Sequence, residues 1–261
     1  MKSFPLDKRL ATNTDYYTES DTALIIQEIG TDDTAKVTAK VEGVPCAEII
    51  TAMAALLQNA SNRLPLFNLG DLFIVVPPDK TYSFSGTASK YVRIKGSILR
   101  FAPGESLPAS FVARYSEQGK KFYSYQADAL DSSASIAAGS ATDLISFTCP
   151  TGEKWVFNNL LMAEATVSSS KNYGFAIRLL LQDEPFDNLI NSKTLLGLDQ
   201  YACPYPPDDT DGANVGTLKD KPIEVKPGQV LKVQAVNVTS GALTIDETTS
   251  KALIVGVREY L

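Results

Sequence analysis

An acidic cluster in an irregular stretch is the group of side chains best suited to chemistry. Asp208, Asp209 and Asp211 precede Gly212 within ACPYPPDDTDGANVG, the sequence of residues 202–216. Spaced aspartates before a glycine can surround a calcium ion with carboxylate and carbonyl oxygens. The full calcium-loop pattern requires a further acidic ligand downstream, and residues 215–218 supply none. The three aspartates are therefore candidate calcium ligands, with an ordinary acidic turn as the favoured interpretation.

Two adjacent carboxylate pairs, Asp183-Glu184 and Asp246-Glu247, are the other candidates for catalysis. A glycosidase needs two carboxylates that face each other across a cleft. Neighbouring residues of a strand point to opposite faces of a sheet, so neither pair provides this geometry by itself. We interpret both pairs as surface charges.

The chain contains no histidine. This absence removes Ser-His-Asp and Cys-His nucleophiles as well as imidazole-based zinc and iron sites. Glycine-rich loops of the dinucleotide-binding and Walker A types are also missing from the sequence. We therefore expect a protein without enzymatic activity and without a cofactor.

Charge and composition restrict the partners. The chain has 24 Lys and Arg against 30 Asp and Glu, a net charge of -6, which argues against a nucleic-acid partner. No apolar run is long enough to span a membrane, and the amino-terminal residues lack the apolar centre of a secretory signal. Three widely separated cysteines, Cys46, Cys149 and Cys203, fit buried thiols in a reducing compartment better than a disulfide framework.

The elements that must position these residues are short strands separated by tight turns. The clearest example is PIEVKPGQVLKVQAVNV, residues 222–238, where Pro227-Gly228 separates two β-rich runs. Similar units occur at IVVPPDKTYSF, residues 74–84, and ISFTCPTGEKWVF, residues 145–157. This pattern predicts a mainly β protein built from two tandem antiparallel β-sandwiches of jelly-roll type, with one or two short helices.

The order of these elements predicts four segments. Residues 1–20 are expected to form an extended arm and 127–143, rich in small residues, a linker; 21–126 and 144–261 are expected to form the two sandwiches. Apolar spacing over residues 45–60 predicts a helix. The runs SFVARYS (110–116) and KFYSYQ (121–126) are expected to pair as a hairpin, and YGFAIRLLL (173–181) and ALIVGVREY (252–260) to be central strands.

The units VVPPDKTYSF and IEVKPGQVLKVQAV, together with the polar amino-terminal segment, resemble those of tailed-bacteriophage virion structural proteins. The likeness is to jelly-roll or sandwich proteins that act as decoration, cement or minor capsid proteins. The resemblance implies a place in the virion after assembly in the host cytoplasm, and contacts with the major capsid protein or other virion proteins. Without histidine, a metal framework or a phosphate loop, the chain is expected to use its surface for protein contacts. We therefore expect a closed homo-oligomer, with a trimer favoured, in which residues 1–20 and 202–216 contact neighbouring subunits.

A second hypothesis is a carbohydrate-binding or host-recognition module. Tyr123, Tyr125 or the tyrosines of the segment 201–205 would then stack on a sugar ring. Aromatic residues of strands are more often cross-strand core pairs, so the structural hypothesis is favoured.

Overall fold

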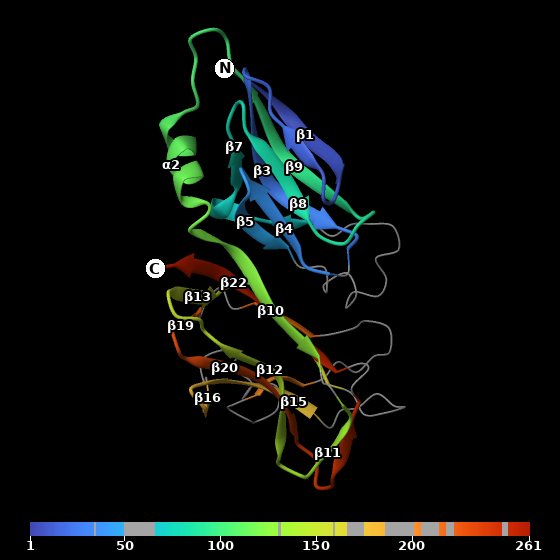
Figure 1. Ribbon diagram of the computed structural model, residues 1–261. Coiled ribbons are helices and arrows are strands. Elements are labelled where there is room, and N and C mark those ends of the chain that lie inside the picture. Colours follow the sequence, from blue (N-terminus) through green and yellow to red (C-terminus); the bar gives the residue numbers. More distant parts are fainter. Residues whose placement is uncertain are drawn as a thin grey trace. The chain divides into compact units, whose positions relative to one another are not determined.

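The computed structural model describes residues 1–33, 35–49, 66–129, 132–158, 160–165, 175–185, 201–204, 214–217, 222–246 and 250–261. The chain divides into two compact units (Figure 1). Among the described residues, unit 1 extends to Ser124 and unit 2 runs from Tyr125 to Leu261. Strands dominate both units, and every described register is antiparallel, which confirms the predicted fold class.

Unit 1 is a sandwich of two sheets. One sheet has the order β1-β9-β3-β6, with β7 also on β3, and the other has the order β2-β8-β4-β5. The strands are β1 (Lys2–Ala11), β2 (Asp15–Tyr17), β3 (Thr22–Thr31), β4 (Val37–Val41), β5 (Val44–Ile49), β6 (Phe67–Asn68), β7 (Ile74–Val76), β8 (Thr81–Ser85) and β9 (Tyr91–Arg100). A short 3-10 helix, η1 (Gly70–Leu72), precedes β7.

The core of unit 1 lies between its two sheets. Leu24 and Ile26 of β3 pack into the same cluster as Tyr82 and Phe84 of β8. The alternate residues of β3, Ala23 and Ile25, are also buried, on the other face of the sheet. β3 is therefore buried on both faces, which explains its nearly continuous apolar sequence.

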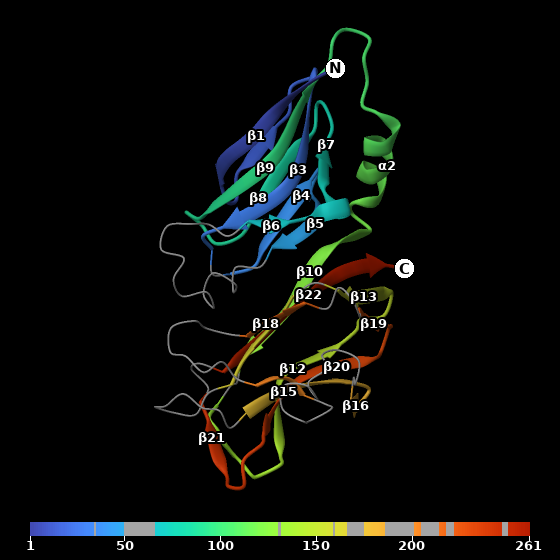
Figure 2. The ribbon, with the colours of Figure 1, turned by 180° about the vertical axis from the view of Figure 1, so that it is seen from behind.

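The outer face of β3 is covered by a helix where the sequence predicted half of a hairpin. Residues Ala109–Glu117 form α2, which lies beside β7 in both ribbon views (Figures 1 and 2). Phe111 and Tyr115, four residues apart, pack toward Ile25 and Leu99. The hairpin prediction was wrong because these aromatic residues were assigned to a strand, whereas their spacing is that of one helical face.

The helix predicted over residues 45–60 was wrong for its first five residues, which belong to a strand. Val44–Ile49 is β5, and residues 50–60 lie outside the described part of the chain. The β4–β5 register shifts between Ala39 and Lys40, and Pro45 lies opposite Lys40 at this irregularity. Proline suits such a place because an edge strand with a bulge leaves backbone positions without a ladder hydrogen bond.

The amino-terminal residues belong to the sandwich. The segment 1–20 was expected to be an extended arm, but β1 pairs with β9 over ten positions and β2 pairs with β8. Leu6 and Leu10 enter the core, with 2% and 8% of their surface exposed. Only these two apolar positions of β1 are buried, so the sequence lacks the alternation by which a strand is recognised.

Unit 2 also has two main sheets. One contains β18-β14-β22-β13-β19 with β10 on β22, the other has β12-β20-β15-β16 with β17 on β15, and β11 pairs with β21. The strands are β10 (Lys121–Ala129), which begins in unit 1, β11 (Ala134–Ile136), β12 (Ala141–Thr148), β13 (Glu153–Phe157), β14 (Leu160–Glu164), β15 (Phe175–Leu181), β16 (Glu184–Pro185), β17 (Tyr201–Pro204), β18 (Asn214–Thr217), β19 (Ile223–Val225), β20 (Val230–Asn237), β21 (Leu243–Ile245) and β22 (Lys251–Tyr260).

The two units share one strand order. β13 and β14 follow each other along β22 and count as one position, as do β18 and β19 beside them. β6 and β7 follow each other along β3 in the same way, and so do β16 and β17 along β15; the β11–β21 pair stands apart. The eight positions are then β1, β2, β3, β4, β5, β6/β7, β8 and β9 in unit 1, and β10, β12, β13/β14, β15, β16/β17, β18/β19, β20 and β22 in unit 2. Each unit has one sheet of order 1-8-3-6 and one of order 2-7-4-5, the arrangement of a jelly roll.

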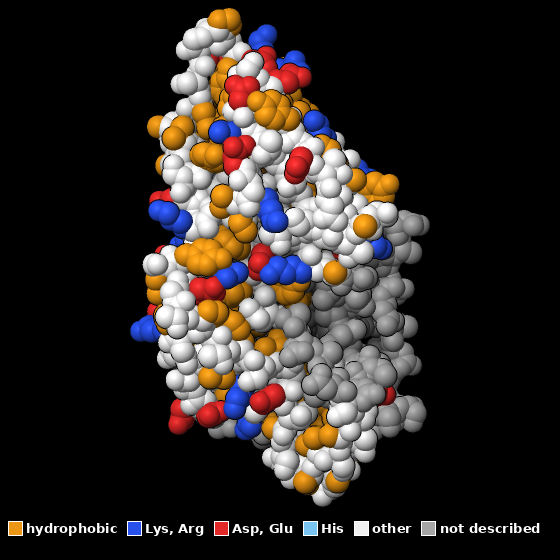
Figure 3. All heavy atoms as spheres, viewed as in Figure 1, with side chains coloured by type: hydrophobic (Ala, Val, Ile, Leu, Met, Phe, Trp, Pro, Cys, Tyr) orange, Lys and Arg blue, Asp and Glu red, His pale blue; other side chains and the backbone are white. Residues whose placement is uncertain are grey.

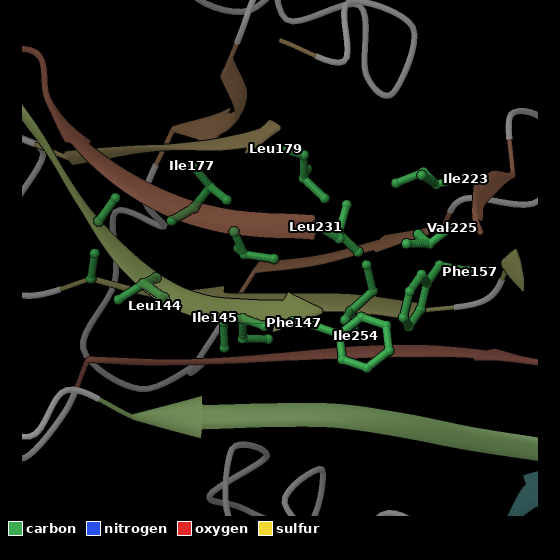
Figure 4. Packing of buried hydrophobic residues seen from close by; sticks show 14 of the residues in the cluster. Leu144, Ile145, Phe147, Phe157, Ile177, Leu179, Ile223, Val225, Leu231 and Ile254 are labelled. Carbon is green, nitrogen blue, oxygen red and sulfur yellow. The ribbon is translucent and has the colours of Figure 1, made fainter. Parts of the chain in front are cut away.

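The core of unit 2 is a second apolar layer (Figure 4). Phe147, Ile177, Leu231 and Ile254, from four different strands, point into it, and Trp155 stacks on Phe157 with 5.5 Å between ring centroids. β15 and β22 have partners on both sides, which confirms that the runs at 173–181 and 252–260 supply central strands.

The segment 127–143, expected to be a linker, contains the end of β10, β11 and the start of β12. It differs from a linker because small residues at 134–136 still pair with β21. Among the described residues, no helix is long and apolar enough to cross a membrane.

Candidate interaction surface

The predicted calcium ligands cannot be placed. Asp208, Asp209 and Asp211 lie outside the described residues. Within the described ranges, no group of three or more Cys, Asp or Glu side chains is arranged to hold a metal ion. The calcium site therefore stays a prediction from sequence.

The carboxylate pairs have different surroundings. Asp183 lies at the turn between β15 and β16 and accepts a hydrogen bond from Lys232 Nζ at 2.6 Å. This bond raises the pKa of Lys232. The side chain of Asp183 is 75% exposed, as expected for a surface charge at a strand end. Asp246 belongs to the described residues and Glu247 does not.

Of the tyrosines proposed to bind sugars, the structure describes the side chains of Tyr123 and Tyr125. Tyr123 is half-buried, and its ring packs edge-on against Phe67 with 5.1 Å between centroids. Burial raises the pKa of its hydroxyl. Tyr125 is also half-buried, the side chain of Tyr201 is not described, and Tyr205 lies outside the described residues. Tyr123 therefore packs as a core-edge residue, with its ring committed to Phe67.

Two of the three cysteines are buried thiols. Cys46 and Cys149 are free and each is 1% exposed. Burial raises the pKa of Cys46 to about 11 and also raises that of Cys149. Thiolates are the reactive form of cysteine, so burial makes both thiols less reactive than an exposed cysteine. The side chain of Cys203 is not described.

A sequon at Asn237-Val238-Thr239 is inaccessible to modification. Asn237 is fully buried, and its amide Nδ2 donates to the carbonyls of Ile136 and Gly241 at 2.9 and 2.7 Å. Its Oδ1 accepts from the N–H and the hydroxyl of Thr239. Asn237 is a structural residue that closes the turn after β20.

A buried carboxylate, Asp33, joins two loops of unit 1 by hydrogen bonds. Asp33 is 1% exposed, and it accepts from Ala35 N–H at 2.8 Å, Thr87 N–H at 2.6 Å and the Thr87 hydroxyl at 2.8 Å. Burial alone would raise the pKa of Asp33, but these hydrogen bonds outweigh it and hold the pKa below its ordinary value. The residues after β3 are thus tied to those after β8.

Side chains close several sheet edges of unit 1. At β7, the amide of Gln118 bonds both backbone groups of Val75, and Arg114 of α2 donates to the carbonyls of Phe73 and Leu72. Sequence reasoning missed this device. Two signals for the helix were present in the sequence. Phe111, Arg114 and Gln118 have the three- and four-residue spacing of one helical face, and Pro108 precedes them, where proline favours the start of a helix.

The edge of β1 is closed in another way. The hydroxyl of Tyr16 accepts from Ala11 N–H at 2.7 Å and donates to Ala11 C=O at 3.3 Å, so this residue's backbone faces away from β9. Backbone direction alternates along a strand, so Pro5 also faces outward, where its missing N–H costs no ladder bond. Such features discourage the addition of another strand.

Basic side chains gather on β1 and β9. The two strands carry six basic residues and one acidic residue, Asp7. Arg9, Arg93 and Lys95 lie on the outer face of this strand pair, whereas Lys2, Lys8 and Arg100 lie on the face that carries Leu6 and Leu10. Figure 3 shows Lys and Arg side chains at several points along the side of unit 1 where β1 lies.

Arg9 and Arg93, the two arginines on the outer face of β1 and β9, already bind carboxylates. Arg93 donates to both oxygens of Asp7, at 2.9 and 2.8 Å, and these bonds hold the pKa of Asp7 below its ordinary value. Arg9 lies 3.5 Å from an oxygen of Asp32, and its guanidinium is 4.1 Å from the ring centre of Tyr91. Both arginines are therefore already paired with carboxylates of the same unit at a solvent-exposed face.

No protein family and no curated protein matches the sequence. Among solved structures, the chain is similar to the major capsid protein P2 from bacteriophage PM2, with 9% identity, a TM-score of 0.38 and 98% of both chains covered. It is also similar to the VP2 subviral particle of infectious bursal disease virus, with 12% identity, a TM-score of 0.28, and 100% of this chain and 76% of that chain covered. A third is A223, a turret protein in Sulfolobus turreted icosahedral virus, with 9% identity, a TM-score of 0.19 and 100% of both chains covered. With TM-scores below 0.5, these likenesses carry no argument about function.

Proposed function

We propose that this chain is a non-catalytic structural protein of a virion that acts through protein–protein contacts. The observation that carries the proposal is the repetition of one eight-position jelly roll in two tandem units, each with its own apolar core. Jelly rolls recur in viral capsid proteins, in lectin domains and in cupins. These classes differ in the side chains that they need for metal binding or sugar binding.

Side-chain chemistry favours the structural role. A metal enzyme on this architecture would ordinarily rely on imidazole ligands, and the chain has no histidine. The carbohydrate-binding hypothesis relied on accessible tyrosine rings, and one of its candidates, Tyr123, packs against Phe67 and is half-buried. Rigid sandwiches whose sheet edges are closed suit assembly through side chains and disfavour assembly by strand addition.

The finer proposal is a decoration, cement or minor capsid protein that binds the major capsid protein or other virion proteins. We propose a closed homo-oligomer, with a trimer as the favoured state, located in the virion. Because β1 supplies core residues, contacts of the segment 1–20 would use its exposed charged side chains while the strand stays in its sheet.

Light scattering and co-sedimentation test this proposal. The mass of the purified chain is measured alone and after mixing with candidate virion shells, with an unrelated acidic protein of similar mass as the control. A closed oligomer that sediments with shells, while the control stays in solution, is the expected result. A monomer that ignores every shell would contradict the proposal, and specific signals on a glycan array would then favour the carbohydrate-binding hypothesis.

A further inference from the structure

Burial along the inner face of β1 changes from one end of the strand to the other. Leu6 and Leu10 are 2% and 8% exposed, whereas Phe4, two positions before Leu6 on the same face, is 44% exposed. Its cross-strand neighbour Ile98 is half-buried, and Leu24, opposite Ile98 on β3, is 3% exposed. The apolar core of unit 1 therefore reaches the surface at Phe4.

Two basic side chains border this apolar row. Lys2 and Arg100 lie directly opposite each other in the next row of the same face, and both are exposed. The guanidinium of Arg100 lies 5.8 Å from the ring centre of Phe4. We name this surface the Phe4 patch; its members are Lys2, Phe4, Ile98 and Arg100. It combines an exposed aromatic ring with two positive charges.

The two charges of the Phe4 patch carry a local cost. Like charges in directly opposite positions destabilise a pair of strands. On the outer face of the same strands Arg93 is paired with Asp7, but within the described part of the chain no carboxylate forms an ion pair with Lys2 or Arg100. Departures from local stability of this kind are expected where a protein makes a functional contact. The two cations are therefore available to an anion from outside the unit.

A partner of the Phe4 patch must bind to its side chains. Pro5 has no N–H to offer, and the hydroxyl of Tyr16 occupies both outward groups of Ala11, so β1 opposes the addition of a strand. Aromatic and arginine side chains often supply most of the affinity of a protein interface. Carboxylates beside an apolar side chain would complement the patch in charge and in polarity.

We propose that the Phe4 patch binds an acidic polypeptide segment of another virion protein. Carboxylates of that segment contact Lys2 and Arg100, and an apolar side chain between them packs on Phe4. This inference rests on the proposed structural function and identifies one contact that it uses. A nucleic acid is disfavoured as the occupant, because phosphate binding relies on many cations and a net charge of -6 repels a polyanion.

NMR titration of the full chain with a blocked peptide, EELEE, tests the patch directly. The peptide should shift the resonances of residues 2–4 and 98–100. Lys2→Gln/Arg100→Gln should weaken binding at least about fivefold, because two exposed ion pairs are lost. The control Lys120→Gln/Lys226→Gln, with the same change of charge at two exposed positions elsewhere, should stay within about twofold of the parent.

The apolar half of the contact has its own comparison. Phe4→Ser should weaken binding of EELEE by about fivefold, since the leucine loses its contact. Val112→Ser removes an apolar side chain of similar exposure, 46%, from α2 and should have no effect. The peptide EESEE should bind the parent about as weakly as EELEE binds Phe4→Ser. Equal affinities for EELEE and EESEE would contradict a role for Phe4.

Thermal unfolding separates a binding role from a structural one. Lys2→Gln/Arg100→Gln should unfold at the same temperature as the parent or higher, because the opposed charges are gone. A lower unfolding temperature would show that the two cations stabilise the unit, and would overturn their assignment to a partner.

Co-sedimentation with candidate virion shells distinguishes the inference from the proposed function. Shells that bind the parent and the Lys2→Gln/Arg100→Gln variant equally well would overturn the inference and leave the proposed function standing. A short labelled oligonucleotide that binds more tightly than EELEE, and is lost in this variant, would assign the patch to phosphate. A parent that binds no shell would instead contradict the proposed function itself.

Discussion

The side-chain amide of Gln118 occupies the place that a neighbouring strand would take beside Val75. Its Oε1 accepts from Val75 N–H at 2.8 Å and its Nε2 donates to Val75 C=O at 2.9 Å. Both residues are buried, with 2% and 0% of their surface exposed. One side chain after α2 thereby satisfies the central residue of a three-residue edge strand and holds the covering helix in place.

Replacing Gln118 with alanine should lower the free energy of unfolding by about 2–4 kcal/mol, because Val75 N–H and C=O would be buried without partners. Urea denaturation measures the loss. Gln229→Ala is the matched control, since Gln229 Oε1 accepts from Lys226 N–H in an exposed turn. Its cost should be below about 1 kcal/mol. Equal losses for the two variants would show that the Gln118 bonds do not stabilise the unit.

Gly96 allows β9 to pass close to β3. At its φ of +155°, an added Cβ would lie 1.9 Å from Ile25 O, where the β3–β9 register shifts between Ile26 and Glu28. Gly96→Ala should cost more than about 3 kcal/mol or prevent folding. The control is Gly104→Ala, at φ +84° with open space around the added atom, which should cost about 1 kcal/mol. Thermal unfolding that ranks the two variants the other way would refute this role.

Asp33 should make stability fall in acid. Its pKa lies below the ordinary value in the folded chain, so its stabilising effect is complete above its unfolded pKa of about 4 and is lost as the pH falls through the folded value. Asp33→Asn should lower the free energy of unfolding by about 2–4 kcal/mol at pH 7, since one amide group cannot accept from all three donors. Urea titrations should show a smaller gap between variant and parent near pH 3. The exposed Asp15→Asn is the control, and a gap that is equal at both pH values would contradict the assignment.

Glu153 and Arg258 form a partly buried ion pair in unit 2. Arg258 Nε donates to Glu153 at 3.0 Å, its Nη2 donates to the other oxygen, and Trp155 Nε1 donates to the same carboxylate at 2.9 Å. Arg258→Met should cost about 2–4 kcal/mol, because a carboxylate with 9% side-chain exposure would lose its cation.

Adding Glu153→Gln to Arg258→Met should recover about 1–2 kcal/mol, since the buried charge is removed and an acceptor for Trp155 is kept. Trp155 is the only tryptophan, so its fluorescence reports unfolding of this unit directly. A double variant less stable than Arg258→Met alone would show that the carboxylate is stabilised by groups other than Arg258.

Local patterns along the chain were sufficient for much of the architecture. Alternation and Pro-Gly turns predicted a mainly β chain, and the apolar runs that supply β15 and β22 predicted central strands, because two buried faces require continuous apolar sequence. The same rules failed at α2, where Phe111 and Tyr115 favour strands in isolation. They failed again at β1, whose exposed edge position leaves only Leu6 and Leu10 apolar and buried.

By itself, the sequence determined the fold class and the absence of imidazole chemistry, because composition and residue spacing are local properties. The tertiary structure decided that both units follow the order 1-8-3-6 and 2-7-4-5, since strand order depends on pairing between residues far apart in the chain. It also decided the two features that matter most for contact. Gln118 closes an edge 43 residues away from it, and Lys2 lies opposite Arg100 only because β1 pairs with β9.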